Sequence, residues 1–153
     1  MCRAGPADFL AQRDTNDKMI RQFQPGKPFL SMTILENITG IIRARYDVDA
    51  IYLYGSRARG QEHAESDWDV AVLFSTFESD MLERVSRPQQ VEAILERELG
   101  LYDQISVVDL ESVPPPLQMN IIQGKRLFDR MVPHVRRVEH SIISKIEKDY
   151  SDA

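Results

Sequence analysis

Two aspartates and a glycine–serine pair stand where they could do chemistry together. Asp67 and Asp69 flank Trp68 at the head of one apolar run, and Gly55-Ser56 closes the preceding apolar run. If the second run is a strand, its alternation places both carboxylates on one face and the indole on the other. Neighbouring carboxylates repel each other unless a cation lies between them, and oxygen ligands of this kind suit Mg²⁺. The pair therefore predicts a metal site.

The glycine–serine pair predicts the phosphate half of the same site. A glycine at the end of a strand allows backbone N–H groups to approach an anion closely, and the hydroxyl of Ser56 adds a donor. A helix that begins just after Ser56 would also attract a phosphate to its N-terminus. Arg57 and Arg59 could then neutralise a triphosphate tail. We therefore predict nucleotide binding by Gly55, Ser56 and Arg57.

The spacing of these residues resembles a known signature. Gly55-Ser56, ten intervening residues and Asp67-x-Asp69 are similar to the GSx10DxD motif of the polymerase-β-type nucleotidyltransferase superfamily. The short chain resembles the minimal branch of that superfamily, the MntA-type antitoxins that accompany HEPN-type HepT toxins. The resemblance extends from about Thr33 to about Phe128. It implies a polymerase-β-like nucleotidyltransferase fold.

The same resemblance implies an activity and a partner. The chain would be an Mg²⁺-dependent enzyme with Asp67 and Asp69 as catalytic metal ligands and ATP as substrate. The acceptor of AMP would be a tyrosine hydroxyl on a HEPN/HepT-type toxin, which adenylylation would silence. Two alternatives remain open: a catalytically degenerate antitoxin that neutralises the toxin by contact, and a nucleotidyltransferase that modifies a small molecule.

One departure from the family pattern bears on catalysis. Members usually carry a third carboxylate on the strand beside the DxD strand, where it helps to hold metal and accepts the acceptor's proton. Alignment of this strand puts Ser106 at that position, while strand parity places Asp103 and Asp109 on the opposite face unless a bulge intervenes. Three outcomes are open: two carboxylates suffice, one of these two aspartates swings in, or the chain binds without turnover.

Composition limits the function further. With 153 residues, 42% of them hydrophobic, the chain has the size and apolar content of one ordinary domain. A net charge of −5 without a long basic run predicts a basic partner surface and no direct binding of nucleic acid. The single cysteine, Cys2, and the absence of a long apolar segment or signal-peptide core predict a cytoplasmic protein without a membrane span.

The predicted domain organisation has three parts. Residues 1–29 are charged, contain glycines and prolines and lack periodicity, so we expect a flexible arm outside the fold, with Met19 or Met32 as alternative natural starts of the protein. Residues 30–130 form the minimal nucleotidyltransferase domain. Residues 131–153 form a C-terminal helix whose apolar stripe packs on the domain or on a partner.

Periodicity predicts an α+β fold. Apolar residues at helical spacing predict four helices, at residues 33–46, 88–99, 117–123 and 133–150. Apolar runs predict four strands, at residues 48–54, 68–74, 105–110 and 126–128. Pro88 is expected in the first turn of its helix, after a connection over residues 75–87. These elements predict a small mixed sheet flanked by helices, mainly on one face.

Overall fold

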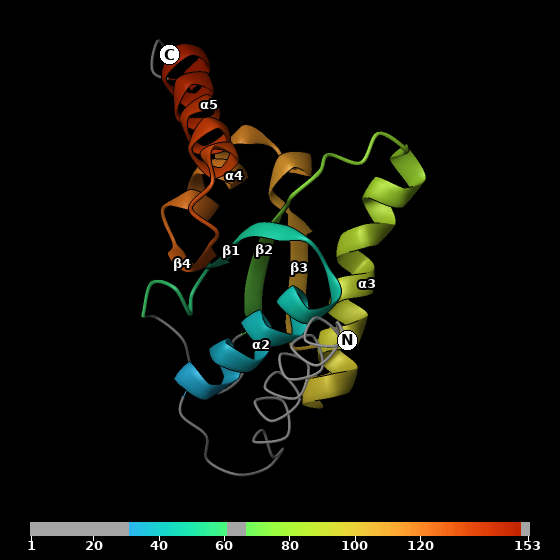
Figure 1. Ribbon diagram of the computed structural model, residues 1–153. Helices are drawn as coiled ribbons and strands as arrows, with labels where there is room; N and C mark the ends of the chain where they lie inside the picture. The colour runs from blue at the N-terminus through green and yellow to red at the C-terminus, as the bar shows by residue number, and fades with distance from the viewer. Residues whose placement is uncertain (1–30, 61–66, 151–153) are drawn as a thin grey trace, which may run out of the picture. The chain divides into compact units, whose positions relative to one another are not determined.

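The structure is a computed structural model that describes residues 31–60 and 67–150 (Figure 1). The predicted arm over residues 1–29 and the loop over residues 61–66 lie outside the described residues. The chain divides into two compact units, Met1–Tyr46 and Asp47–Ala153, which are described separately. The elements are α2 (Ser31–Arg45), β1 (Val48–Tyr54), β2 (Trp68–Phe74), α3 (Met81–Leu99), β3 (Ile105–Asp109), the 3-10 helix η1 (Leu110–Ser112), α4 (Pro115–Ile122), β4 (Lys125–Asp129) and α5 (Pro133–Tyr150).

Helix α2 is the described element of the first unit. Ile38, Ile41 and Ile42 are buried at the i, i+3, i+4 spacing of one helical face, as their periodicity predicts. The helix begins two residues before the predicted range, so Thr33 lies within it and not at its N-cap.

The second unit is built on a four-stranded mixed sheet with the order β3-β2-β1-β4. Strand β1 is antiparallel to both β2 and β4, and β2 is parallel to β3. Strands β1 and β2 match the predicted ranges residue for residue. Every residue of these two central strands is buried except Asp69, which explains why they read as continuous apolar runs.

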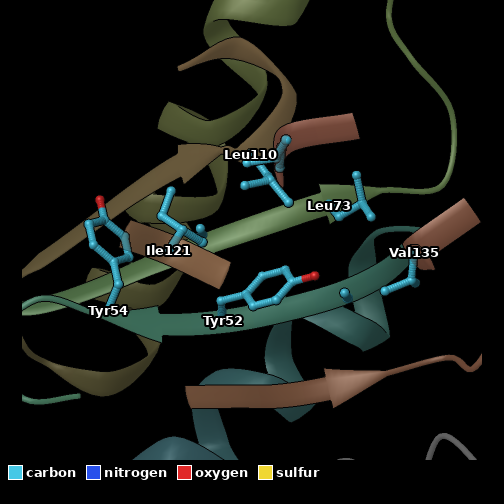
Figure 2. Close-up of a cluster of buried hydrophobic side chains, with 9 residues drawn as sticks. Tyr52, Tyr54, Leu73, Leu110, Ile121 and Val135 are labelled. Carbon is cyan, nitrogen blue, oxygen red and sulfur yellow. The ribbon is translucent and has the colours of Figure 1, made fainter. Parts of the chain in front are cut away.

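Helices α4 and α5 cover one face of this sheet. Figure 2 shows Tyr52 and Tyr54 projecting from β1 on the same side as Leu73 from β2. The cluster that they form with the covering elements contains nine buried residues: Ala50, Tyr52, Tyr54, Ala71, Leu73, Leu110, Ile121, Val135 and Ile142. Two residues of the predicted α5 stripe, Val135 and Ile142, therefore pack in the core of their own unit.

Helix α3 lies on the other face of the sheet. The guanidinium of Arg87 lies 3.8 Å from the centroid of the Phe74 ring and 3.3 Å from Asp109. Glu92 accepts a hydrogen bond of 2.9 Å from the backbone N–H of Val107. The expectation that helices lie mainly on one face is therefore wrong. The parallel β2-α3-β3 crossover places its helix against one face, while the chain after β3 turns through η1 onto the other.

The start of α3 also differs from the prediction. The helix begins at Met81, seven residues before Pro88, because Asp80 caps it by accepting a 3.0 Å hydrogen bond from the N–H of Glu83. Pro88 consequently lies inside the helix. The first two turns bury no apolar residue, so periodicity carried no sign of them. The helix ends at Leu99 as predicted, and Gly100 after it adopts the left-handed conformation with φ 68° that commonly closes a helix.

The remaining elements lie close to their predicted places. Helix α4 begins two residues before the predicted helix, and β4 extends the predicted strand by one residue at each end. Helix α5 has the predicted bounds. No helix among residues 31–60 and 67–150 is long and apolar enough to cross a membrane.

Polar contacts anchor α5 to the sheet. The hydroxyl of Tyr52 donates a 2.6 Å hydrogen bond to Glu139, which also forms an ion pair with Arg126 of β4. At the start of the helix, His134 lies 2.7 Å from the buried carboxylate of Asp49. Since each contact joins residues more than ten positions apart, together they hold the helix in one register on the sheet.

Gly124 provides a steric test of this architecture. A Cβ at this position would run into the backbone carbonyl oxygen of Leu53, where β4 pairs with β1. Gly124→Ala should therefore lower the free energy of unfolding by about 1 to 3 kcal/mol, measured by urea denaturation. Gln123→Ala, at an exposed neighbour, is the matched control and should change stability by less than about 0.5 kcal/mol. Equal stability of the two variants would contradict this packing.

Candidate active site

The two halves of the predicted motif meet at one edge of the sheet. Strand β1 ends at Tyr54, directly opposite Asp69 in the antiparallel β1-β2 ladder. Gly55 follows at once, and a Cβ on it would collide with the Asp69 Oδ2 atom and lie 3.2 Å from its Cγ. A side chain at position 55 would therefore occupy the space of this carboxylate.

The backbone after β1 makes a single helical turn. Gly55 has φ 75°, a left-handed conformation that glycine adopts without strain. Its carbonyl oxygen accepts hydrogen bonds from the N–H groups of Ala58 (3.2 Å) and Arg59 (3.3 Å). Ser56 is half-buried in this turn. The described part of the loop is thus turned back tightly beside the carboxylate.

At this edge of the sheet, burial and two neighbouring charges all act on the carboxyl group of Asp69. Burial raises the pKa of Asp69, the neighbouring Asp67 raises it further, and Arg59 partly lowers it. The ionised form of Asp69 is thus disfavoured although Arg59 acts on it. A divalent cation shared with the exposed Asp67 would relieve both the repulsion and the desolvation, so this donor set fits Mg²⁺.

Tyr54 is a site residue that the sequence analysis missed. It lies opposite Asp69 and also belongs to the core cluster under α4. Burial, with a smaller contribution from Asp69, raises the pKa of Tyr54 to about 12. Its phenol therefore stays neutral at physiological pH and forms the inner wall of the site. Only the cross-strand pairing identifies this neighbour, since sequence spacing separates the two residues by the whole motif loop.

The two arginines of the turn have different positions. The Arg57 guanidinium lies 3.8 Å from the centroid of the Trp68 ring, and Trp68 points to the face opposite Asp69. The structure thus places the predicted nucleotide-binding residue Arg57 against the indole and not beside the carboxylate. Arg59 is the cation whose charge acts on Asp69.

The position of the third carboxylate is occupied by Ser106. In the parallel β2-β3 ladder Ser106 pairs with Asp69, as the alignment of this strand predicts. Asp109 pairs with Val72 on the other face and is bound by Arg87 at 3.3 Å. Asp103 lies in the exposed turn before β3. Among the residues that the structure describes, no group of three or more His, Cys, Asp or Glu side chains could hold a metal ion.

This fold and site define a nucleotidyltransferase class, and the comparisons with known proteins agree. Residues 36–131 match the family described as polymerase beta, nucleotidyltransferase, so the chain belongs to this family. The protein adenylyltransferase MntA of Shewanella oneidensis strain MR-1 is 34% identical over 79 residues, which are 51% of this chain and 52% of the relative. The chain thus spans about half the length of the curated relative that it matches.

Solved structures share the fold. A crystal structure of a toxin-antitoxin with AMP-PNP is similar with a TM-score of 0.58 and 22% identity, over 80% of this chain and 92% of that chain. A structure of the tri-AMPylated Shewanella oneidensis HEPN toxin in complex with the MNT antitoxin gives a TM-score of 0.57 and 20% identity, over the same shares. At these identities the likeness shows the fold.

The raised pKa of Asp69 predicts a pH-dependent stability. Because Asp69 ionises less readily in the folded state, its ionisation lowers the free energy of unfolding. This loss is absent below the unfolded pKa near 3.8 and complete above the higher folded pKa. Asp69→Asn removes this loss, so at pH 7 in EDTA it should raise the melting temperature. The gain should shrink as pH falls toward 3.8. Asp103→Asn, in the exposed turn, is the control; an Asp69→Asn variant less stable than wild type at pH 7 would refute this electrostatic assignment.

Proposed function

We propose that this chain is an Mg²⁺-dependent protein adenylyltransferase that transfers AMP from ATP to a tyrosine hydroxyl of a HEPN/HepT-type toxin and so acts as its antitoxin. The observation that carries the proposal is the convergence of Gly55 and Asp69 at one strand edge, within the GSx10DxD spacing. The similarity to a protein adenylyltransferase supports the activity. The toxin–antitoxin complexes that share the fold support the partner.

Each residue of the edge has a role in this proposal. Asp67 and Asp69 would hold Mg²⁺, which would neutralise charge on the phosphates. Gly55 and Ser56 receive the outer phosphates through backbone N–H groups and the serine hydroxyl. Arg59 adds positive charge at the same edge. The acceptor oxygen then attacks the α-phosphorus, the new O–P bond forms, and pyrophosphate leaves with the electrons of the broken bond.

Ser106 in place of an acid favours an acidic acceptor. Among the described residues, Asp67 is assigned to the metal and no third carboxylate stands beside Asp69 to take the acceptor's proton. A tyrosine hydroxyl ionises at about pH 10, far more readily than an aliphatic alcohol, so its proton can pass to solvent. A phenol therefore needs a general base less than a sugar or serine hydroxyl does.

The direct test combines the purified chain, ATP, Mg²⁺ and the product of the gene next to its own as the candidate toxin, with intact mass spectrometry as readout. We expect the toxin to gain one or more AMP units, and Asp67→Asn to abolish the gain. Asp103→Asn should transfer at the wild-type rate, since its carboxylate lies in an exposed turn. A folded, mixed pair that shows no mass gain would refute adenylyl transfer.

A second candidate is an antitoxin that neutralises by contact alone, and the replacement of the third acid by Ser106 is the observation in its favour. In this case the site binds a nucleotide or a partner without turnover.

The two candidates predict opposite results in cells that express the toxin. Under adenylyl transfer, Asp67→Ala combined with Asp69→Ala abolishes protection, measured as colony formation. Under contact alone, the double variant protects as well as wild type. Immunoblotting should show equal amounts of both proteins, so that a loss of protection reports chemistry and not degradation.

A further inference from the structure

The first turns of α3 carry an exposed apolar patch that the site does not use. The patch consists of Phe77, Met81, Leu82 and Val85, with exposed fractions of 56%, 71%, 72% and 56%. Met81, Leu82 and Val85 also line a hollow of about 640 Å³. Large apolar side chains gathered in this way mark an interaction surface more often than scattered ones do.

This α3 patch lies on an ordered scaffold. Asp80 caps the helix, and the guanidinium of Arg84 donates a 2.8 Å hydrogen bond to the carbonyl of Glu78. Arg84 also lies 4.8 Å from the centroid of the Phe77 ring, which ties the preceding connection to the helix. Further along, Arg87 binds Asp109 of β3. A surface organised before binding loses little conformational entropy on docking.

The charges around the α3 patch select the kind of partner. Glu78 and Asp80 lie in the connection just before α3 and Glu83 lies in its first turn, so all three are sequence neighbours of the patch. The two arginines of this segment are engaged by aromatic rings and by a carbonyl or carboxylate of their own unit: Arg84 with Phe77 and Glu78, Arg87 with Phe74 and Asp109. Arg87 is neutralised by Asp109, whereas Arg84 keeps its positive charge, so three acids against one arginine leave the border net acidic, on a chain of net charge −5. It complements an apolar stripe flanked by Lys or Arg.

The α3 patch lies far from the chemistry. Asp69 stands at the beginning of β2, whereas the chain reaches Phe77 only after β2 has ended. Five residues of β2 follow Asp69, so the end of the strand lies roughly 17 Å from it. Figure 1 shows the first turns of α3 extending beyond the strands, on the side where β2 ends. A partner held there leaves the strand edge at Gly55 and Asp69 open to an acceptor side chain.

We propose that the α3 patch docks a basic amphipathic helix of the toxin, with apolar residues at i, i+4 spacing set against Met81, Leu82 and Val85. The identification of the partner as the toxin rests on the proposed function, whereas the apolar surface is observed independently of it.

The first test measures binding of the full chain to the toxin by calorimetry. Leu82→Lys places a positive charge in the patch and should weaken binding at least tenfold. Tyr102→Lys, at a residue 61% exposed beyond the other end of α3, is the matched control and should bind as wild type. Asp67→Asn should keep full affinity while losing transfer. With Leu82→Lys the KM for toxin should rise while kcat and ATP affinity stay unchanged.

The outcomes separate this proposal from the proposed function. Loss of binding in Leu82→Lys supports docking even if no AMP is transferred. Wild-type affinity in that variant overturns docking even if transfer occurs.

Hydroxyl-radical footprinting tests the occupant. Met81 and Met131 are 71% and 72% exposed, so they form a matched pair of oxidation probes. Toxin should protect Met81 and leave Met131 reactive. Protection of Met81 without toxin would overturn the proposal. If the free chain is then a dimer, the patch binds a second copy; if it is a monomer, the patch binds another segment of the same chain.

Discussion

The register between β1 and β2 is the constraint on which the rest of the structure depends. It pairs Tyr54 with Asp69 and so brings the glycine corner against the carboxylate. A slip by one residue would turn Asp69 to the face of Trp68 and bury the acid among apolar side chains. Both central strands are buried on both faces, so that slip would also force each apolar side chain into a space shaped for a different one, which costs packing energy. The core thus fixes the site's geometry.

That geometry keeps an unfavourable charge in place. Asp69 is half-buried beside Asp67, and its raised pKa shows that the folded protein stabilises its ionised form poorly. The neighbouring Tyr54 stays neutral and adds no compensating charge. Such a site lowers the stability of the fold and attracts a cation. This trade between stability and binding is common at functional sites. The apolar cluster and the contacts of α5 supply stability elsewhere.

The two arginines of the turn point in different directions and act on different groups. Arg57 stacks on Trp68 and helps to cover the buried indole, so its charge lies on the face away from Asp69. Arg59 acts on the carboxylate. Ser106 pairs with Asp69 on β3, so the described part of this edge has Asp67 and Asp69 as its acids and Arg59 as the cation that acts on Asp69.

The sequence by itself determined the central strands, the mixed sheet, α5 and the carboxylate pair with its glycine–serine corner. These features have local causes: strands buried on both faces leave continuous apolar runs, and motif spacing is a property of one segment. It also anticipated Ser106 beside Asp69, because alternation along a strand is regular. The sequence did not predict the beginning of α3, because a cap at Asp80 outweighed the tendency of Pro88 to start a helix.

Only the tertiary structure decided the placement of helices on both faces, the adjacency of Tyr54 to Asp69, the direction of Arg57 and the exposure of the first turns of α3. All four depend on which distant segments pair and which side chains they leave uncovered. Cross-strand register and burial arise from the whole fold, and no window of neighbouring residues contains them.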